Sequence, residues 1–338
     1  MVANNEVASV WSEPGAFEVA PGVHRIPLPL PNDGLRAVNV YAIEDGDGLV
    51  MVDSGWALDE ARDQLEAALG TLNKGFEDIR RFLVTHVHRD HYTMAVSLRR
   101  LFGGRIGLGL GEQPSLLHML HGQDDQHVAD LRKWGASELA ETWIRIMHHV
   151  DRGEALRDYE EPDEWLTAST LDLEHRRLEV VPTPGHTRGH VVFVDHTAKV
   201  LFSGDHVLPH ITPSIGFEPL RPELPLGDYM TSLRLTRALP DLKLLPAHGP
   251  VTDSSHARVD ELLQFHEQRL EEILKAASGS AFETARKIGW TRRQRRFDDL
   301  DMFNQVLAIG ETAAHLDVLV ERGELTRTDN AGVLEYQA

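Results

Sequence analysis

The sequence feature that most constrains the fold is a dense run of metal-binding side chains directly after a buried strand pattern. Residues 79–84 read Ile-Arg-Arg-Phe-Leu-Val, which is typical of a buried strand. Four candidate ligands follow within six residues: His86, His88, Asp90 and His91. Alternate side chains of an extended chain share a face, so His86 and His88 can reach one ion together. Asp90 and His91 lie where a helix pattern begins and can turn toward a second ion.

Three further candidate ligands occur in the same kind of setting. His186 lies in Pro-Thr-Pro-Gly-His between two strand patterns, Asp205 in Ser-Gly-Asp after a strand, and His248 in Ala-His-Gly after another. Strand ends beside glycine or proline are where α/β folds collect functional groups. Imidazole and carboxylate ligands suit Zn²⁺, Fe²⁺ or Mn²⁺ better than Ca²⁺ or Mg²⁺. A single carboxylate such as Asp205 can bridge two ions, and a bound metal lowers the pKa of water to about 7.

Together these motifs resemble the metallo-β-lactamase superfamily of hydrolases over about residues 20–250. The motifs that carry the resemblance are Thr-His-x-His-x-Asp-His at residues 85–91, Pro-Gly-His186, Ser-Gly-Asp205 and Ala-His248-Gly. The resemblance implies an α/β fold, a four-layer αββα sandwich with metals at one edge between two sheets. It implies two divalent metal ions, Zn²⁺ first and Fe²⁺ or Mn²⁺ as alternatives. The implied ligands are His86, His88 and His186 for one metal and Asp90, His91 and His248 for the other, with Asp205 bridging.

A change in the pattern of expected strands and helices divides the chain into a catalytic domain at 20–252 and a C-terminal part at 253–338. The catalytic domain contains a helical insertion at 112–165. The C-terminal part has a linker helix, two further helices and a hairpin, which is the outline of a winged-helix domain. Strand patterns occur at 24–31, 35–43, 48–52, 79–84, 106–110, 178–181, 190–195, 199–203 and 242–245. Helix patterns occur at 57–72, 93–102, 228–238, 254–277, 281–288 and 301–322, and Asp53 or Ser54 can cap the first of them.

Composition narrows the classes of protein. The chain has 338 residues, 34 Lys plus Arg against 53 Asp plus Glu, and a net charge of −19, which argues against nucleic acid as a partner. It has no cysteine, which excludes disulfides and thiolate ligands. The N-terminus lacks a signal-peptide pattern and no segment is long and apolar enough to span a membrane, so we expect a cytoplasmic protein. A small-molecule substrate is the expected partner, and a homodimer is left open.

The sequence gives less support for a functional role of the other histidines and aromatic residues. His210, Tyr92 and His190 are candidate substrate-binding residues because they lie close to ligands in sequence, and His190 is also a candidate partner of His186. Trp134, Trp143 and Trp165 of the insertion indicate core packing, or alternatively an apolar lid over the metals. Ten histidines are expected at the surface: His118, His121, His127, His148, His149, His175, His196, His256, His266 and His315.

The absence of cysteine, with His91 present and Asp205 in the second metal site, is similar to the glyoxalase II, lactonase and thioesterase branches. The expected function is a dinuclear hydrolase that uses a metal-bound hydroxide to cleave a small ester, thioester or lactone, with Asp90 as catalytic residue. Lactonases carry a tyrosine where this chain has His206 and His210. One alternative is a metal-dependent endoribonuclease that uses Arg292–Arg296, and another is a mononuclear iron persulfide dioxygenase. A DNA-binding regulator is rejected because residues 301–322 are acidic.

Overall fold

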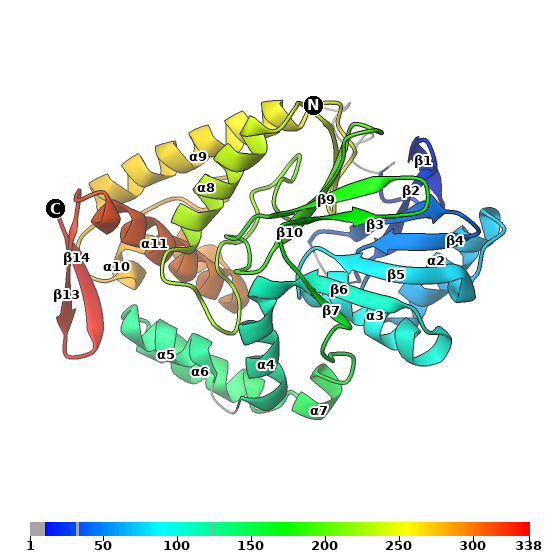
Figure 1. Ribbon diagram of the computed structural model, residues 1–338. Coiled ribbons are helices and arrows are strands. Elements are labelled where there is room, and N and C mark those ends of the chain that lie inside the picture. The colour runs from blue at the N-terminus through cyan, green and yellow to red at the C-terminus, as the bar shows by residue number, and fades with distance from the viewer. Residues whose placement is uncertain (1–10, 32–33, 123–124, 292) are drawn as a thin grey trace.

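The computed structural model describes residues 11–31, 34–122, 125–291 and 293–338, and its centre is a pair of facing β-sheets (Figure 1). The first sheet has seven strands in chain order: β1 (Phe17–Ala20), β2 (Val23–Pro29), β3 (Ala37–Asp45), β4 (Gly48–Val52), β5 (Ile79–Val84), β6 (Arg105–Gly109) and β7 (Glu164–Leu166). The second has the order β12-β11-β10-β9-β8: β8 (Ser169–Asp172), β9 (Arg177–Pro182), β10 (Val191–Asp195), β11 (Val200–Gly204) and β12 (Lys243–Pro246).

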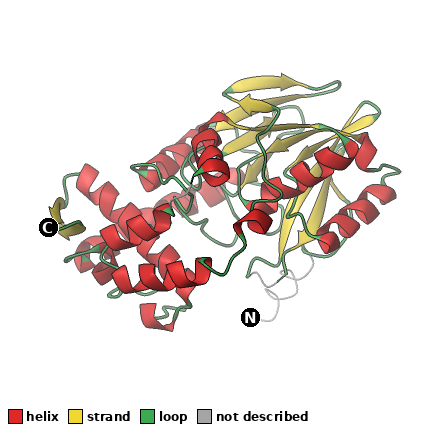
Figure 2. Cartoon of the chain, turned by 90° about the horizontal axis from the view of Figure 1, so that it is seen from below, coloured by secondary structure: helices red, strands yellow, loops and turns green. Residues whose placement is uncertain are grey.

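Helices cover the outer face of each sheet, which completes the four layers expected from the sequence (Figure 2). On the seven-stranded sheet, Leu65 of α2 (Asp59–Thr71) and Val96 of α3 (Arg89–Phe102) join one buried apolar cluster with strand residues. Helices α8 (Pro225–Ala238) and α9 (Ser255–Ala276) share another cluster with the five-stranded sheet. Between the sheets, Tyr41 meets Phe202 edge to face at 5.4 Å. The mixed α/β sandwich is therefore confirmed.

The strand directions bring several chain segments to one edge. β4, β5 and β6 are parallel, and β11 is parallel to β12. β9 runs antiparallel to β10, which runs antiparallel to β11, so β9 has the direction of β11. Because the carboxyl ends of parallel strands lie on the same side, the residues that follow β4, β5, β9, β11 and β12 meet there.

Several element boundaries differ from the sequence expectation, and those beside the site matter most. β7 has only three residues, and β8 has four that are mostly polar, so both lack the apolar run that marks a strand. Helix α3 begins at Arg89 rather than residue 93, which puts Asp90 and His91 in its first turn. Helix α2 begins after Leu58 without a side-chain cap, so neither Asp53 nor Ser54 caps it.

The insertion contains α4 (Gln113–His121), α5 (Gln126–Lys133), α6 (Ser137–Met147) and α7 (Arg152–Ala155). The C-terminal part contains α10 (Ala281–Ala285), α11 (Met302–Glu321) and the hairpin β13 (Thr326–Asn330) with β14 (Val333–Gln337); short turns of 3-10 helix lie at Phe76–Asp78, Leu110–Glu112 and Phe297–Asp299. Trp134 and Trp143 are buried in one apolar cluster with residues of α11 and β14, so both tryptophans serve core packing. The winged-helix assignment stays a prediction.

Among the described helices, none combines the length and the apolar character needed to cross a bilayer.

The surface expectation is wrong for two histidines. His266 on α9 and His315 on α11 are 1% and 0% exposed. His315 Nδ1 donates to the Glu311 carbonyl at 2.8 Å, which leaves its Nε2 to accept from His266 Nδ1 at 3.3 Å. Burial, with a smaller effect of Arg269, lowers the pKa of His266 to about 3, and burial with His266 lowers that of His315. A pair of neutral imidazoles therefore joins the two helices.

This pair should make stability fall on acidification. Both folded-state pKa values lie below the unfolded value of about 6.5, so the unfolded chain binds protons first as the pH falls. Each histidine then removes up to about 1.4 kcal/mol of unfolding free energy per pH unit between about 6.5 and its folded pKa. Urea unfolding of metal-free protein at pH 7 and pH 5 measures this. The double variant His266→Leu/His315→Leu should have the shallower pH dependence, and equal slopes would contradict the prediction.

Candidate metal centre

Five histidines and two aspartates gather at the edge where the strand ends meet. His86 and His88 follow β5, and Asp90 and His91 occupy the first turn of α3. The other three come from the second sheet: His186 from the loop after β9, Asp205 directly after β11, and His248 two residues after β12. The structure thus brings together all seven ligands expected from the sequence.

The first group is made of three imidazoles whose ring nitrogens face one another. His186 Nε2 lies 3.2 Å from His86 Nε2 and 3.1 Å from His88 Nδ1. Burial and the neighbouring histidines lower the pKa of His86, and the same effects lower that of His88 to about 3. Burial also lowers the pKa of His186, against Asp205. All three rings are therefore neutral, which is the form that binds a metal.

The second group is made of Asp90, His91 and His248. The Oδ2 atom of Asp90 lies 3.6 Å from His91 Nε2 and 3.4 Å from His248 Nε2. Burial alone would lower the pKa of His91, but Asp90, Asp53 and Asp205 together raise it to about 10. Three carboxylates around one buried imidazole are a surplus of negative charge, which a divalent cation would neutralise.

Asp205 lies between the two groups and faces both. Its Oδ1 is 3.7 Å from His91 Nε2 and 3.4 Å from His248 Nε2, while its Oδ2 is 3.5 Å from His186 Nε2. Burial would raise the pKa of this carboxyl, but His248 and His91 lower it. An ionised carboxylate with one oxygen toward each group has the arrangement of a bridging ligand.

The second nitrogen of every histidine is held by a protein oxygen, as metal-binding imidazoles usually are. The pairs are His86 Nδ1 with Thr85 Oγ1 (3.0 Å), His88 Nε2 with the Phe217 carbonyl (3.2 Å), His91 Nδ1 with Asp53 Oδ2 (2.9 Å), His186 Nδ1 with the Ser214 carbonyl (2.7 Å) and His248 Nδ1 with the Ala37 carbonyl (2.8 Å). Each contact orients its imidazole ring so that the inner nitrogen faces the centre.

The residues therefore fit a metal. In the first group, three lone pairs converge with no proton between them, an arrangement that a cation stabilises. In the second group, His91 Nε2, Asp205 Oδ1 and His248 Nε2 are buried without a hydrogen-bond partner among the described residues. Such orphaned buried atoms are rare in folded proteins unless an ion or water satisfies them. Potential ligand atoms lie within 4.8 Å of one another in three sets: His86, His88 and His186; His86, His91 and Asp205; and Asp90, His91 and His248.

Asp53 is a functional residue that the sequence reasoning assigned only as a possible helix cap. It follows β4 at the same edge, is 2% exposed, and has a φ of 57°. Its carboxylate accepts the Thr85 N–H at 2.8 Å and the Thr85 hydroxyl at 3.0 Å, and His91 Nδ1 donates to it at 2.9 Å. Because Thr85 donates its only hydroxyl proton to Asp53, it accepts from His86. One carboxylate thus orients a histidine of each group, and its position after a strand was the available signal.

Replacing Asp53 with alanine should weaken Zn²⁺ binding by about ten- to a hundredfold, the usual effect of removing a group that orients metal ligands. Competition against a chromophoric chelator measures the affinity. Asp45→Ala is a matched control. Asp45 is also a buried aspartate, 8% exposed, and accepts the Glu174 N–H at 2.6 Å, but it lies beside the start of β4, at the end of the sheet away from Asp53. Equal Zn²⁺ affinity in the Asp53 variant and the parent protein would contradict the assigned role.

The three candidate substrate residues lie in different places. His190 is fully buried and stacks on His86 at 5.1 Å; its Nε2 accepts the Asp205 N–H at 3.2 Å, so it supports the bridging residue rather than His186. Tyr92 is fully buried and donates to the Glu160 carbonyl at 2.7 Å. Substrate contact by either would need the site to open. His210 is exposed in the loop after β11, and its role stays a prediction.

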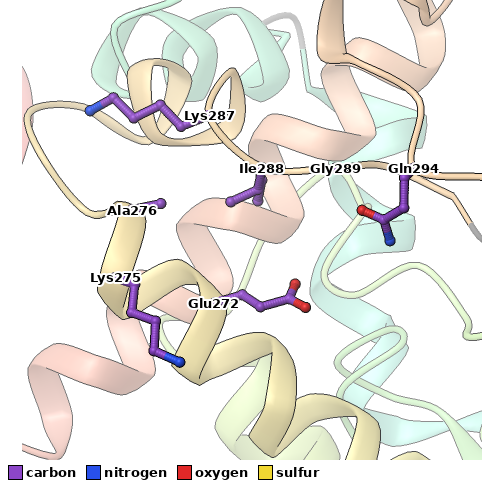
Figure 3. Close-up of a pocket in the computed structure, with 7 residues that line it drawn as sticks. All are labelled: Glu272, Lys275, Ala276, Lys287, Ile288, Gly289 and Gln294. Carbon is purple, nitrogen blue, oxygen red and sulfur yellow. The ribbon is translucent and has the colours of Figure 1, made fainter.

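A surface hollow of about 460 Å³ lies elsewhere, in the C-terminal part (Figure 3). It is lined by Glu272, Lys275, Ala276, Lys287, Ile288, Gly289 and Gln294. None of the seven candidate ligands borders it, so it plays no part in the metal centre.

Comparison with known proteins agrees with the geometry. Residues 33–248 match the metallo-beta-lactamase superfamily, and the chain belongs to this superfamily. Residues 292–338 match the metallo-beta-lactamase-like C-terminal domain. With its cluster of histidines and aspartates, the chain is a metal-dependent hydrolase of this superfamily.

Individual relatives cover much of the chain. A beta-lactamase-like protein 2 homolog from Caenorhabditis elegans is 25% identical over 289 residues, which are 84% of this chain and 76% of that one. The hydroxyacylglutathione hydrolase GloC from Haemophilus influenzae is 28% identical over 185 residues, 52% of this chain and 71% of that one. The crystal structure of a metallo-beta-lactamase family protein from Thermus thermophilus has a TM-score of 0.77 at 25% identity and covers 94% of this chain and 99% of that one.

Proposed function

We propose that this protein is a dinuclear metal hydrolase that cleaves a small thioester, ester or lactone. The observation that carries the proposal is Asp205, whose two oxygens face two separate ligand groups. The proposed metals are two Zn²⁺ ions, one at His86, His88 and His186 and one at Asp90, His91 and His248. Fe²⁺ and Mn²⁺ accept the same ligands.

When bound, such ions polarise a carbonyl oxygen and lower the pKa of water to about 7. The remaining chemistry belongs to the chain. Asp90 directs one oxygen at the imidazoles of His91 and His248, and we assign to this carboxylate the proton of the attacking water. The carboxyl of Asp90 is ionised, as a metal ligand must be, because His91 and His248 hold its pKa far below the usual value despite its burial.

The substrate class rests on chemistry and on one relative. A site with a polarised carbonyl and an activated water suits acyl transfer to water. The relative named hydroxyacylglutathione hydrolase points to an acyl group carried on a thiol, so thioesters come first among the candidates. The lack of cysteine places this chain apart from the thiolate-containing β-lactamases. A small molecule, rather than nucleic acid, is the proposed partner.

Metal content by mass spectrometry and a substrate panel test the proposal. Two metals per chain, with hydrolysis of thioesters, esters or lactones that stops on chelation, is the expected result. One iron per chain with persulfide oxidation would replace the proposal by an oxygenase. Chelator-sensitive cleavage of RNA would replace it by a ribonuclease; Arg293, Arg295 and Arg296 are exposed, while Arg292 lies outside the described residues.

A further inference from the structure

The helical insertion begins in direct backbone contact with the loop that carries His186. A Cβ atom on Gly189 would overlap the backbone nitrogen of Glu112, and one on Gly109 would overlap the carbonyl of Gly189. A Cβ on Gly111 would lie 2.7 Å from the Cα of Gly189. Only glycine permits this approach, so the start of the insertion is seated against a metal-ligand loop.

Glu112 lies at this contact and has no exposed surface. Its Oε1 accepts the hydroxyl of Thr187, the residue after His186. The backbone N–H of Val87, the residue between His86 and His88, lies close enough to the same carboxyl group to lower its pKa. Its Oε2 is buried without a hydrogen-bond partner among the described residues. One buried side chain therefore touches both segments that supply the three-histidine group.

Glu218 is a second buried carboxyl group, 2% exposed, that contacts the same loop. Its Oε1 accepts the Arg188 N–H at 2.8 Å and its Oε2 accepts the Ser115 hydroxyl of α4 at 2.8 Å. The chain just before it holds two ligands, because the Ser214 carbonyl accepts from His186 and the Phe217 carbonyl accepts from His88. Glu218 thus fastens a segment that orients two of the three histidines to the insertion.

From these contacts we infer that Glu112 and Glu218 are positioning residues that set the spacing of His86, His88 and His186. Neither carboxyl group belongs to a candidate ligand set. The inference rests on the proposed function, in that this group holds a metal. Metal–nitrogen distances tolerate errors of about 0.2 Å, so loosening either segment should weaken binding. Burial and repulsion by Glu218 raise the pKa of Glu112 to about 8, which makes glutamine a close substitute for its protonated acid. Burial raises the pKa of Glu218 to about 7.

The test uses the full-length protein and Zn²⁺ or Co²⁺ alone, without substrate. Glu112→Ala and Glu218→Ala should each weaken Zn²⁺ binding by about ten- to a hundredfold and shift the visible absorption of bound Co²⁺. Glu112→Gln keeps an oxygen for the Thr187 hydroxyl, so it should restore the affinity to within a few fold of the parent protein. Thermal unfolding of each metal-free variant reports any general loss of stability.

Asp195→Ala is the matched control. Asp195 is 1% exposed, accepts the Thr197 and Ala198 N–H groups, and lies at the far end of β10. This variant should lose stability and keep both the Zn²⁺ affinity and the Co²⁺ spectrum. Should an alanine variant fail to fold, Ser115→Ala and Thr187→Val each remove one hydroxyl donor, and both should weaken Zn²⁺ binding.

Parent-like Zn²⁺ affinity and Co²⁺ spectra in the folded Glu112 and Glu218 variants would overturn the inference while leaving the proposed function intact. So would variants whose only defect is a lower unfolding temperature. If the parent protein itself binds no metal, the proposed function fails instead, so the two failures can be told apart.

Discussion

His88→Ala should lose Zn²⁺ from the three-histidine group and, with it, hydrolytic activity. The variant removes one of three inner nitrogens, the Nδ1 atom that lies 3.1 Å from His186 Nε2. Removing a group that merely orients a ligand costs about ten- to a hundredfold in affinity or activity, so removing a ligand should cost more than about a hundredfold. The fold should survive, since His88 is only partly buried and its other nitrogen contacts a single carbonyl.

Metal analysis and activity measurement on the same preparation check this prediction. His196→Ala is a suitable control: His196 is exposed and paired with Glu179 at 2.6 Å, so both metal content and turnover should stay at the parent level. Full activity in His88→Ala would remove the assignment of this group to catalysis. Loss of the metal with unchanged activity would show that this metal takes no part in the reaction.

Removing the metal from the parent protein should also lower its unfolding temperature. Without a cation, the inner nitrogens of the first group face one another, and Asp90 and Asp205 repel in the second. A ligand that binds only the folded state adds about 4 kcal/mol when its free concentration is a thousand times Kd. For 338 residues, whose unfolding entropy is about 2.1 cal/mol/K per residue, that corresponds to about 6 °C.

Differential scanning calorimetry before and after chelation measures the shift, and added Zn²⁺ should reverse it. His88→Ala should respond less to Zn²⁺ than the parent protein because one group is incomplete. An unfolding temperature that chelation leaves unchanged would show that no metal stabilises this edge of the sandwich.

The grouping of the seven candidate ligands was predictable because each of them follows a strand or a Gly/Pro turn in a short motif. Such motifs are local, and the parallel strand ends collect them. Asp53 has the same setting after β4, but a lone aspartate before a helix pattern also fits a cap, and only the fold shows its contact with His91. Glu112 and Glu218 carry no motif, since their roles arise from contacts between distant segments.

The remaining differences also come from tertiary packing. Periodicity could not show that His266 and His315 would face each other across α9 and α11, because polar residues are expected at surfaces. The three residues of β7 are too few to show a strand pattern in the sequence, yet they pair with β6 in the sheet. The long-range contacts of the tryptophans were likewise invisible in the sequence.

The shared core of the insertion and the C-terminal part limits how this protein can be divided. The Trp134 carbonyl accepts the Phe282 N–H at 3.1 Å, and Leu131 and Trp134 are buried in one cluster with residues of α11 and β14. Ending the chain at residue 252 would uncover these apolar side chains beside the segment that Glu112 and Glu218 fasten to the ligands. The C-terminal part of the polypeptide therefore shares the hydrophobic core of the hydrolase, and biochemical work on the metal centre should use the full-length chain.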